Sequence, residues 1–268
     1  MVLKQAALDK KENDKKHTPE STLVIFEDTE ALLISPKSDI NKMYYRTKLN
    51  LHNVSFFNCK NKKVLNYLWD ETQAGLTAHV FATIHLDYLS KQLEQNPQVK
   101  EVIAHSNGCV YQNKNAPLAN GVRRLAVKHG IVITWKYLEV GHTFMECDSY
   151  HRLVEDKLKT TNINIPADYV NVIKTARKKP EPYEVRFDNP LPYTFFKNYD
   201  EHQDLQSIRP GYKPNDPTVN DLKQIKYSPD GMVSYKLRHA DLDFTPLPAM
   251  RKAPKPTEVT YQPLYNNP

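Results

Sequence analysis

The stretch HSNGCVYQNKN, from His105 to Asn115, and the stretch GHTFMECDSYHRLVE, from Gly141 to Glu155, decide the fold and the candidate chemistry of this chain. The first stretch follows the apolar run Val99–Ala104, which has the length of a buried strand. Open α/β sheets bind ligands beyond the carboxyl ends of their strands. A functional site is therefore expected here, although Asn107 stands where metal chemistry would require an aspartate.

Apolar periodicity on both sides of this stretch gives an order of elements. Three strand-like stretches come first, and helices then alternate with strands. The expected elements are Leu23–Phe26 with Ala31–Ile34, Tyr44–Asn58, Val64–Trp69, the helix Thr77–Leu93, Val99–Ala104, the helix Leu118–Lys128, Ile131–Leu138 and a helix from about Cys147. This β-β-β-α-β-α-β-α order is found in the ribonuclease H-like fold, so we predict an α/β protein with a mixed five-stranded sheet flanked by helices.

The remaining segments set the expected domain organisation. Residues 1–21 have no apolar period and are expected to form a disordered tail, followed by the ribonuclease H-like domain at residues 22–175. The hairpin signal Ser228–Gly231 predicts a small β-rich module at residues 176–250. Residues 251–268 are rich in proline and are expected to be an extended tail.

Composition narrows the class of protein. The 268 residues carry a formal net charge of +6 and have a pI near 9.0, which suits contact with DNA or RNA without requiring it. No apolar run is long enough to cross a bilayer or to act as a signal peptide, so no membrane partner is expected. Three widely spaced cysteines favour a reducing compartment, nuclear or cytoplasmic. The oligomeric state stays open.

The nuclease chemistry associated with this fold needs carboxylates on the first strand, at the end of the fourth strand and on the last helix. They hold two divalent cations, Mg²⁺ or Mn²⁺, about 4 Å apart. Two of these three positions are acidic in this chain, because Asn107 occupies the strand end. The candidate catalytic residues are Glu27, Asp28, Asn107, Asp148 and Glu155, of which Asp28, Asn107 and Asp148 are the candidate metal ligands.

Four segments carry a resemblance to a known family: MYYRTKLNLHNVSFFN, HSNGCVYQNKN, KYLEVGHTFMECDSYHRLVE and SIRPGYKPNDPTVNDLKQIKYSPDG. They resemble transposon-derived, ribonuclease H-like proteins that are abundant in insect genomes, over roughly residues 22–250. The resemblance implies an aspartate at the strand end, which Asn107 replaces, and a Phe-Asp motif that reads Phe26-Glu27-Asp28 here. The motif Gly141–Asp148 is kept, and a long preceding helical region is missing. We therefore expect a shortened, partly degenerate member.

Structural interpretations compete with these assignments. Asn107 suits a turn before Gly108, and its amide supplies no negative charge to a metal site. Asp148 would be stabilised in the first turn of a helix whatever its function. Glu155 fits a solvated helix face. An impaired metal site is the reading we favour, with Mg²⁺ or Mn²⁺ as cofactor if the protein is active and no cofactor otherwise.

A second possible metal site consists of Cys109, His142, Cys147 and His151, because Cys147 and His151 are four residues apart on one expected helix. No tight Cys-x-x-Cys pair accompanies them, so burial of the cysteines in the core is the favoured interpretation. His142 could instead act as a hydrogen-bonding residue at the strand end.

Polar and basic residues beyond the strand end could contact a phosphate backbone, or could merely cap and solvate their helices. They are Gln112, Asn113, Lys114, Arg123, Arg124 and Lys128, with Lys178 and Lys179 in a later basic cluster. Three functions follow: a degenerate relic that binds nucleic acid nonspecifically without cutting it, an active metal-dependent nuclease or transposase, or a protein-interaction scaffold.

Overall fold

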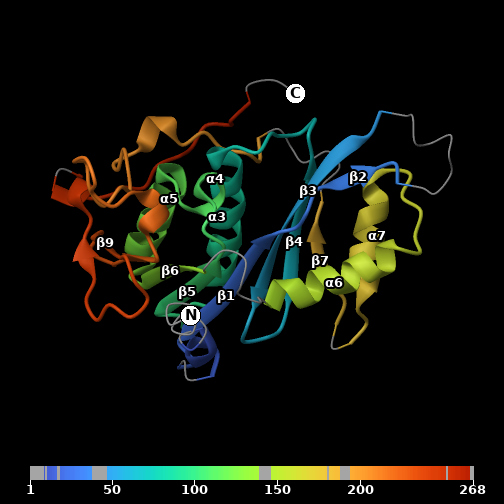
Figure 1. The fold of residues 1–268 in the computed structure, drawn as a ribbon, viewed down its shortest axis with the longest axis horizontal. Helices are drawn as coiled ribbons and strands as arrows, with labels where there is room; N and C mark the ends of the chain where they lie inside the picture. Colours follow the sequence, from blue (N-terminus) through green and yellow to red (C-terminus); the bar gives the residue numbers. More distant parts are fainter. Residues whose placement is uncertain are drawn as a thin grey trace. The chain divides into compact units, whose positions relative to one another are not determined.

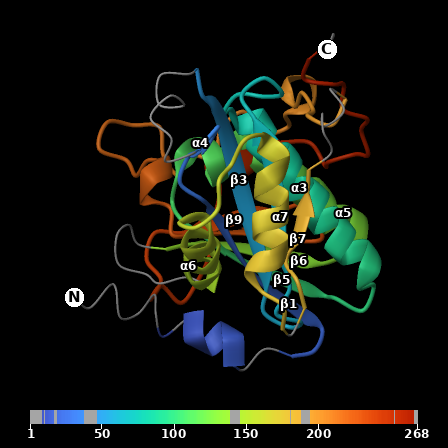
Figure 2. The same cartoon turned by 90° about the vertical axis from the view of Figure 1, so that its right-hand side faces the viewer.

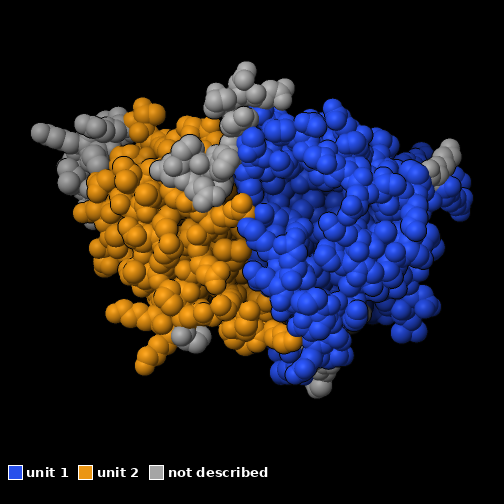
Figure 3. Space-filling model, turned by 180° about the vertical axis from the view of Figure 1, so that it is seen from behind, with its two compact units in different colours: residues 1–25, 76–143, 194–268 blue, residues 26–75, 144–193 orange. Residues whose placement is uncertain are grey.

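The computed structural model describes residues 9, 11–16, 19–37, 47–138, 146–179, 181–187, 194–251 and 253–265. The chain divides into two compact units (Figure 3). Unit 1 comprises Met1–Ile25, Leu76–Thr143 and Thr194–Pro268, and unit 2 comprises Phe26–Gly75 and Phe144–Tyr193. Strand β1 (Thr22–Thr29) passes from unit 1 into unit 2.

Unit 2 consists of strands covered on one face by two helices, as Figures 1 and 2 show. Strands β2 and β4 pair antiparallel with β3, and β7 pairs parallel with β4. Apolar residues of β2, β3 and β4 pack against α6 and α7 to form its core. The elements are β2 (Leu33–Ser35), β3 (Leu49–Asn58), β4 (Val64–Asp70), α6 (Glu146–Leu158), α7 (Pro166–Ala176) and β7 (Glu184–Arg186).

Unit 1 combines a parallel pair of strands with an antiparallel extension. Strand β6 pairs parallel with β5 and antiparallel with β8, which continues to β9 and β10. Helix α3 packs against α5 (Figure 1). The elements are α3 (Ala78–Gln95), β5 (Glu101–Ser106), α4 (Val110–Asn113), α5 (Ala116–His129), β6 (Val132–Tyr137), the 3-10 turns Asp200–His202, Val219–Asp221 and Pro248–Arg251, β8 (Gln224–Tyr227), β9 (Val233–Lys236) and β10 (Thr245–Pro246).

The predicted α/β class is confirmed, and the predicted elements occur in the expected order up to α6, with β2 as a separate strand and the short helix α4 as additions. The predicted sheet of five strands was too small, because the strands of the described residues belong to one sheet of ten. Strands from residues 176–250, which we expected to form a separate module, pair with β4 and β6 instead. Helix α7 was not predicted, although Pro166 at its first turn and Asp168, which accepts hydrogen bonds from backbone N–H groups before the helix, are start signals.

The N-terminal residues also differ from the expectation of a disordered tail. Residues 11–16 are helical. Oδ2 of Asp14 lies 2.6 Å from Nζ of Lys136 and 3.1 Å from Nε2 of His105, both of which are buried. These charged contacts anchor a segment whose lack of an apolar period had suggested disorder. No helix in the described ranges is long and apolar enough to cross a membrane.

Candidate metal centre

Strand β1 places its acidic residues on two faces. Side chains alternate along a strand, so Asp28 and Glu27 point to opposite faces. Asp28 is directed at α6, where its Oδ2 lies 3.7 Å from Nδ1 of His151. Glu27 is completely buried. Asp28, rather than Glu27, is therefore the carboxylate that the first strand contributes to the site.

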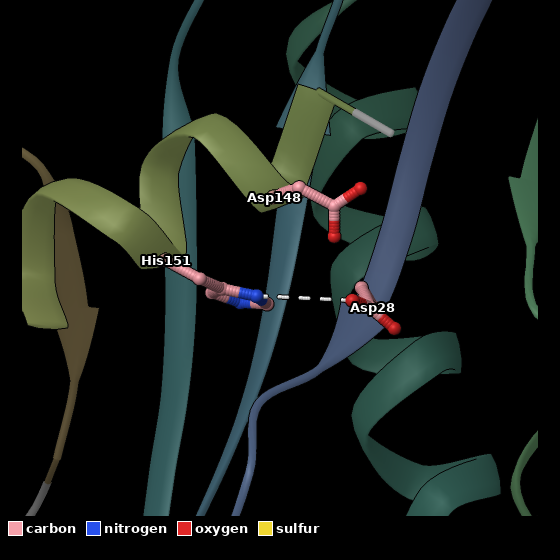
Figure 4. A group of neighbouring side chains, drawn as sticks. All are labelled: Asp28, Asp148 and His151. Atoms are coloured by element: carbon pink, nitrogen blue, oxygen red, sulfur yellow. Dashed lines mark ion pairs between the residues drawn. The ribbon is translucent and has the colours of Figure 1, made fainter. Parts of the chain in front are cut away.

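Helix α6 supplies the other two members of the site. Asp148 and His151 are three residues apart, which places them on one face of the helix. One ligand atom from each of Asp28, Asp148 and His151 lies within 4.8 Å of the other two. Figure 4 shows the three side chains converging from α6 and β1. In the part of the chain that the structure describes, this is the group of acidic, histidine or cysteine residues that could hold a metal ion.

The surroundings of His151 favour the neutral form of its ring, which is the form that binds a metal ion. Its side chain is buried, and desolvation lowers the pKa of its imidazole to about 4. The ring is therefore neutral at physiological pH, as a metal ligand must be. Its Nε2 lies 2.7 Å from Oγ of Ser55 on β3, while Nδ1 faces Asp28. One nitrogen is thus engaged by the protein and the other faces the carboxylates.

The chemistry of this donor set fits a divalent cation. Asp28 and Asp148 are both only partly buried, so solvent and ions in solution can reach their carboxyl groups. Two carboxylate oxygens and one imidazole nitrogen are a common protein ligand set for divalent metals, and they leave further coordination positions for water or a phosphate oxygen. The sequence predicted Asp28 and Asp148 as ligands, and the structure brings them together with His151.

A buried polar network lies on the same face of β1. Nδ2 of Asn53 donates hydrogen bonds to Oε2 of Glu30 at 2.7 Å and to Oδ1 of Asn66 at 3.3 Å, and it lies 3.4 Å from the Tyr150 hydroxyl. Burial raises the pKa of Glu30 to about 7, and the negative charge of Glu155 adds to the effect, whereas the bond from Asn53 opposes it. Glu155 itself is exposed on α6 and acts on this network through its charge.

The proposed cysteine and histidine cluster does not form around Cys147. This cysteine is completely buried, and its Sγ lies 3.6 and 3.8 Å from two backbone carbonyl oxygens. Burial, helped by the charge of Asp28, raises the pKa of the Cys147 thiol well above its ordinary value, which keeps it protonated. The core interpretation is confirmed for Cys147, and His151 joins the aspartates instead. Cys109 is partly buried in unit 1, and His142 lies outside the described residues.

Asn107 is a turn residue in unit 1. Its Oδ1 accepts hydrogen bonds from the backbone N–H of Cys109 at 3.1 Å and from Nδ2 of Asn113 at 3.2 Å. The amide oxygen thereby organises the turn that leads into α4. The turn interpretation is confirmed, and the grouping of Asn107 with Asp28 and Asp148 stays a prediction.

The polar residues that follow Asn107 are internal rather than exposed. Gln112, Asn113 and Lys114 are all buried. Nζ of Lys114 donates to the carbonyl oxygen of Asn220 at 3.3 Å and lies 4.5 Å from the ring centroid of Tyr137. The prediction that these three residues contact a phosphate backbone is wrong for the described conformation, because all three are buried.

The arginines of α5 are also used within the protein. Arg123 is 2% exposed and donates from Nε to Gly231 O at 2.6 Å and from Nη2 to Pro254 O at 2.8 Å. Arg124 donates to Thr257 O at 2.6 Å. The two guanidinium groups thereby hold the segment around Pro254 and Thr257 against α5. The expectation that they lie on the surface for phosphate binding was wrong for Arg123, which is buried. Arg124 is partly buried, and its guanidinium group is bonded to other residues of unit 1.

Exposed positive charge remains elsewhere. Lys178 and Lys179 follow α7 and are exposed, as is Lys174 within it. Nζ of Lys128 at the end of α5 lies 3.2 Å from a carboxylate oxygen of Glu258, and both side chains are largely exposed. A surface ion pair of this kind is weak and can be exchanged for a phosphate.

Sequence reasoning missed the supporting residues Ser55 and Asn53. They stand two apart in LHNVSFFN, so their side chains share one face of β3 with the residues that contact α6. Small polar residues recurring at every second position of an otherwise apolar strand were the available signal.

Comparison of the chain with protein-family models, with curated proteins and with solved structures found no match.

Proposed function

We propose that this chain is a transposon-derived, ribonuclease H-like protein that binds nucleic acid nonspecifically and keeps only part of a metal-dependent nuclease centre. The observation that carries the proposal is the convergence of Asp28, Asp148 and His151. Two of the three carboxylate positions that the nuclease chemistry needs, the first strand and the last helix, provide these residues.

The element order supports the same proposal. Three long strands, β1, β3 and β4, precede α3, and β5, α5, β6 and α6 then alternate. Asn107 follows β5, the fourth long strand of this series. The order is the one that suggested the ribonuclease H-like fold from the sequence, and it supports that assignment by analogy alone.

Loss of charge at Asn107 is the reason to expect impaired cleavage. A two-metal mechanism depends on carboxylates that hold both ions and stabilise the leaving oxygen. An amide oxygen contributes no charge, and Oδ1 of Asn107 already accepts two hydrogen bonds. We propose that one cation binds beside Asp28 and Asp148, and that hydrolysis is very slow or absent.

Nucleic-acid binding would depend on exposed lysines at the C-terminal end of α7, one in its last turn and two just after it. Lys174, Lys178 and Lys179 provide a local cluster of positive charge in unit 2. Such a cluster neutralises phosphates without reading bases. Lys128 is the member of the α5 set that stays available.

A nuclease assay with Mn²⁺ tests the proposal on the wild type, on Asn107→Asp and on the double variant Asn107→Asp with Asp148→Asn. Both hydrogen bonds to Asn107 Oδ1 come from N–H donors, so a carboxylate can accept them and the turn should fold. We expect little or no cleavage by the wild type, measurable cleavage by Asn107→Asp, and its loss in the double variant.

Other outcomes point to the alternatives. Efficient cleavage by the wild type that Asp148→Asn abolishes would establish an active nuclease. If neither cation nor nucleic acid binds to the wild type, the proposal fails and the scaffold function is favoured.

A further inference from the structure

We propose that the centre formed by Asp28, Asp148 and His151 selects a single nitrogen-accepting transition-metal ion of the Zn²⁺ class over Mg²⁺, with Nδ1 of His151 as a ligand and Ser55 as the residue that positions the ring. The inference rests on the proposed function, which places a cation at this site, and it specifies the kind of ion and the atom that selects it.

The ligand set differs from the one that the sequence suggested. Mg²⁺ prefers an octahedral shell of oxygen atoms and retains several waters, whereas imidazole nitrogen favours Zn²⁺ and its neighbours in the transition series. His151 replaces an oxygen donor in the group with Asp28 and Asp148. Three protein ligands with a remaining position for water form the usual arrangement of a reactive zinc site.

The distances require only small adjustments. A tetrahedral ion with bonds of about 2.1 Å separates its ligand atoms by roughly 3.4 Å. Nδ1 of His151 and Oδ2 of Asp28 are 3.7 Å apart, and the full set lies within 4.8 Å. Asp148 lies in the first turn of α6, where its side chain has more freedom than the buried ring of His151.

The hydrogen bonds of Ser55 determine which nitrogen is presented. Ser55 Oγ lies 3.3 Å from the carbonyl oxygen of Asp28, to which it donates, and 2.7 Å from Nε2 of His151. When the Ser55 proton points to that carbonyl, Nε2 of His151 carries the ring proton and donates it to Oγ. Nδ1 then has the lone pair, and it faces Asp28. A ligand histidine is commonly fixed through its other ring nitrogen in this way.

Burial makes this arrangement specific to one tautomer. Ser55 is completely buried, and His151 is 8% exposed, so no bulk water competes for Nε2. The backbone carbonyl of Ser55 also lies 3.8 Å from Sγ of Cys147, one turn before His151 on α6. Strand β3 and helix α6 are thereby held together beside the ring, and Ser55 is a positioning residue rather than a ligand.

Titration calorimetry on the full chain tests the selectivity, with Zn²⁺ and Mg²⁺ as separate probes and Co²⁺ absorption as a readout of coordination. We expect Zn²⁺ to bind at one ion per chain and more tightly than Mg²⁺. His151→Gln should weaken Zn²⁺ binding by at least about 10-fold and leave Mg²⁺ binding nearly unchanged. Asp148→Asn should weaken the binding of both ions. If His151→Gln does not fold, this variant still tests whether the ions bind at this site.

The role of Ser55 has its own readout. Ser55→Ala should weaken Zn²⁺ binding by about 10-fold or more and change the tautomer of His151, as seen in the ¹⁵N shifts of its ring. Ser55→Thr keeps the hydroxyl and should restore much of the affinity. The controls are Asp156→Asn, an exposed change on α6, and His129→Gln at the end of α5, neither of which should alter binding.

The outcomes separate the two proposals. If Zn²⁺ and Mg²⁺ bind equally and His151→Gln changes neither, the inference is overturned while a cation site at Asp28 and Asp148 stands. If neither ion binds to the folded wild type, the metal part of the proposed function falls as well.

Discussion

Nδ2 of Asn53 lies 2.7 Å from Oε2 of Glu30 in the interior of unit 2, yet this hydrogen bond does not keep the carboxyl group acidic. Burial disfavours the ionised form, and the charge of Glu155 adds to that effect. The pKa of Glu30 consequently rises to about 7. Glu30 is therefore a carboxyl group that gains a proton when the chain folds near neutral pH.

Glu30 should make folding stability depend on pH. Its pKa is raised from 4.5 in the unfolded chain to about 7, so its favourable contribution is complete below pH 4.5 and is lost as pH rises through about 7. Glu30→Gln should remove up to about 3 kcal/mol of this pH dependence. The measurement is urea denaturation of both proteins from pH 4.5 to 8.

A matched variant identifies the cause. Glu155→Gln removes the exposed negative charge that raises the pKa of Glu30, so it should lower that pKa. The pH-dependent loss of stability should then end at a lower pH than in the wild type. An identical pH profile in the wild type and in Glu30→Gln would show that the pKa of Glu30 is the same in the folded and unfolded states.

Replacing Asn107 with aspartate should destabilise the protein less than replacing it with alanine. Asn107→Asp keeps an oxygen that accepts from the N–H groups of Cys109 and Asn113, whereas Asn107→Ala leaves both donors without it. We expect Asn107→Ala to cost about 1 kcal/mol in the free energy of unfolding, in the range of a lost cap, and Asn107→Asp to cost less. Chemical denaturation of the two variants in the absence of metal measures the difference.

The sequence was sufficient for the elements whose signal is local. Helix α5 begins after Asn115, whose Oδ1 accepts from Leu118 N, and ends at Gly130 with a φ of 63°, so both boundaries are readable from residue type. The β8–β9 hairpin was predicted from Ser228–Gly231 for the same reason. Pairings between distant segments, such as β7 with β4, carry no such local signal.

The candidate site was predictable only in part. Asp28 and Asp148 were found because the element order indicated where carboxylates should stand. His151 was noticed for its spacing from Cys147, but spacing alone cannot show that the thiol faces backbone carbonyls while the imidazole faces Asp28. The burial of Arg123 was missed because its partners, Gly231 and Pro254, are more than one hundred residues away.

Arg123 should be important for stability. Its removal leaves the carbonyl oxygens of Gly231 and Pro254 without their donor, and it removes a cation 3.5 Å from Asp204. Arg123→Ala should lower the free energy of unfolding by about 2–4 kcal/mol, whereas Lys128→Ala on the exposed part of α5 should change it by less than about 0.5 kcal/mol. Equal effects of the two substitutions in urea denaturation would contradict the structural role of Arg123.

Arg124 should stabilise the position of residues 253–265 and not the fold of unit 1 as a whole. It donates to Thr257 O and Asp204 Oδ2, and the same segment is bonded further on by Leu264 N to Phe196 O at 2.7 Å. Arg124→Ala should accelerate amide hydrogen exchange within residues 253–265 while the amides of β5 and β6 keep their protection. Uniform acceleration in both regions would mean that the segment does not open independently.

Nucleic-acid binding should depend on the exposed lysines after α7 and should not depend on the buried arginine of α5. At physiological salt, we expect dissociation constants of roughly 10⁻⁴ to 10⁻⁶ M, with little preference for sequence. The double variant Lys178→Gln with Lys179→Gln should weaken binding and lower the slope of log K against log salt by about 0.7 to 0.9 for each phosphate contact that is lost.

Lys159→Gln, an exposed change beyond the end of α6, is the matched control and should leave the slope unchanged. Filter binding over a series of salt concentrations measures both quantities. A strong preference for one sequence would contradict nonspecific phosphate binding, and an absence of binding at low ionic strength would remove nucleic acid as the partner.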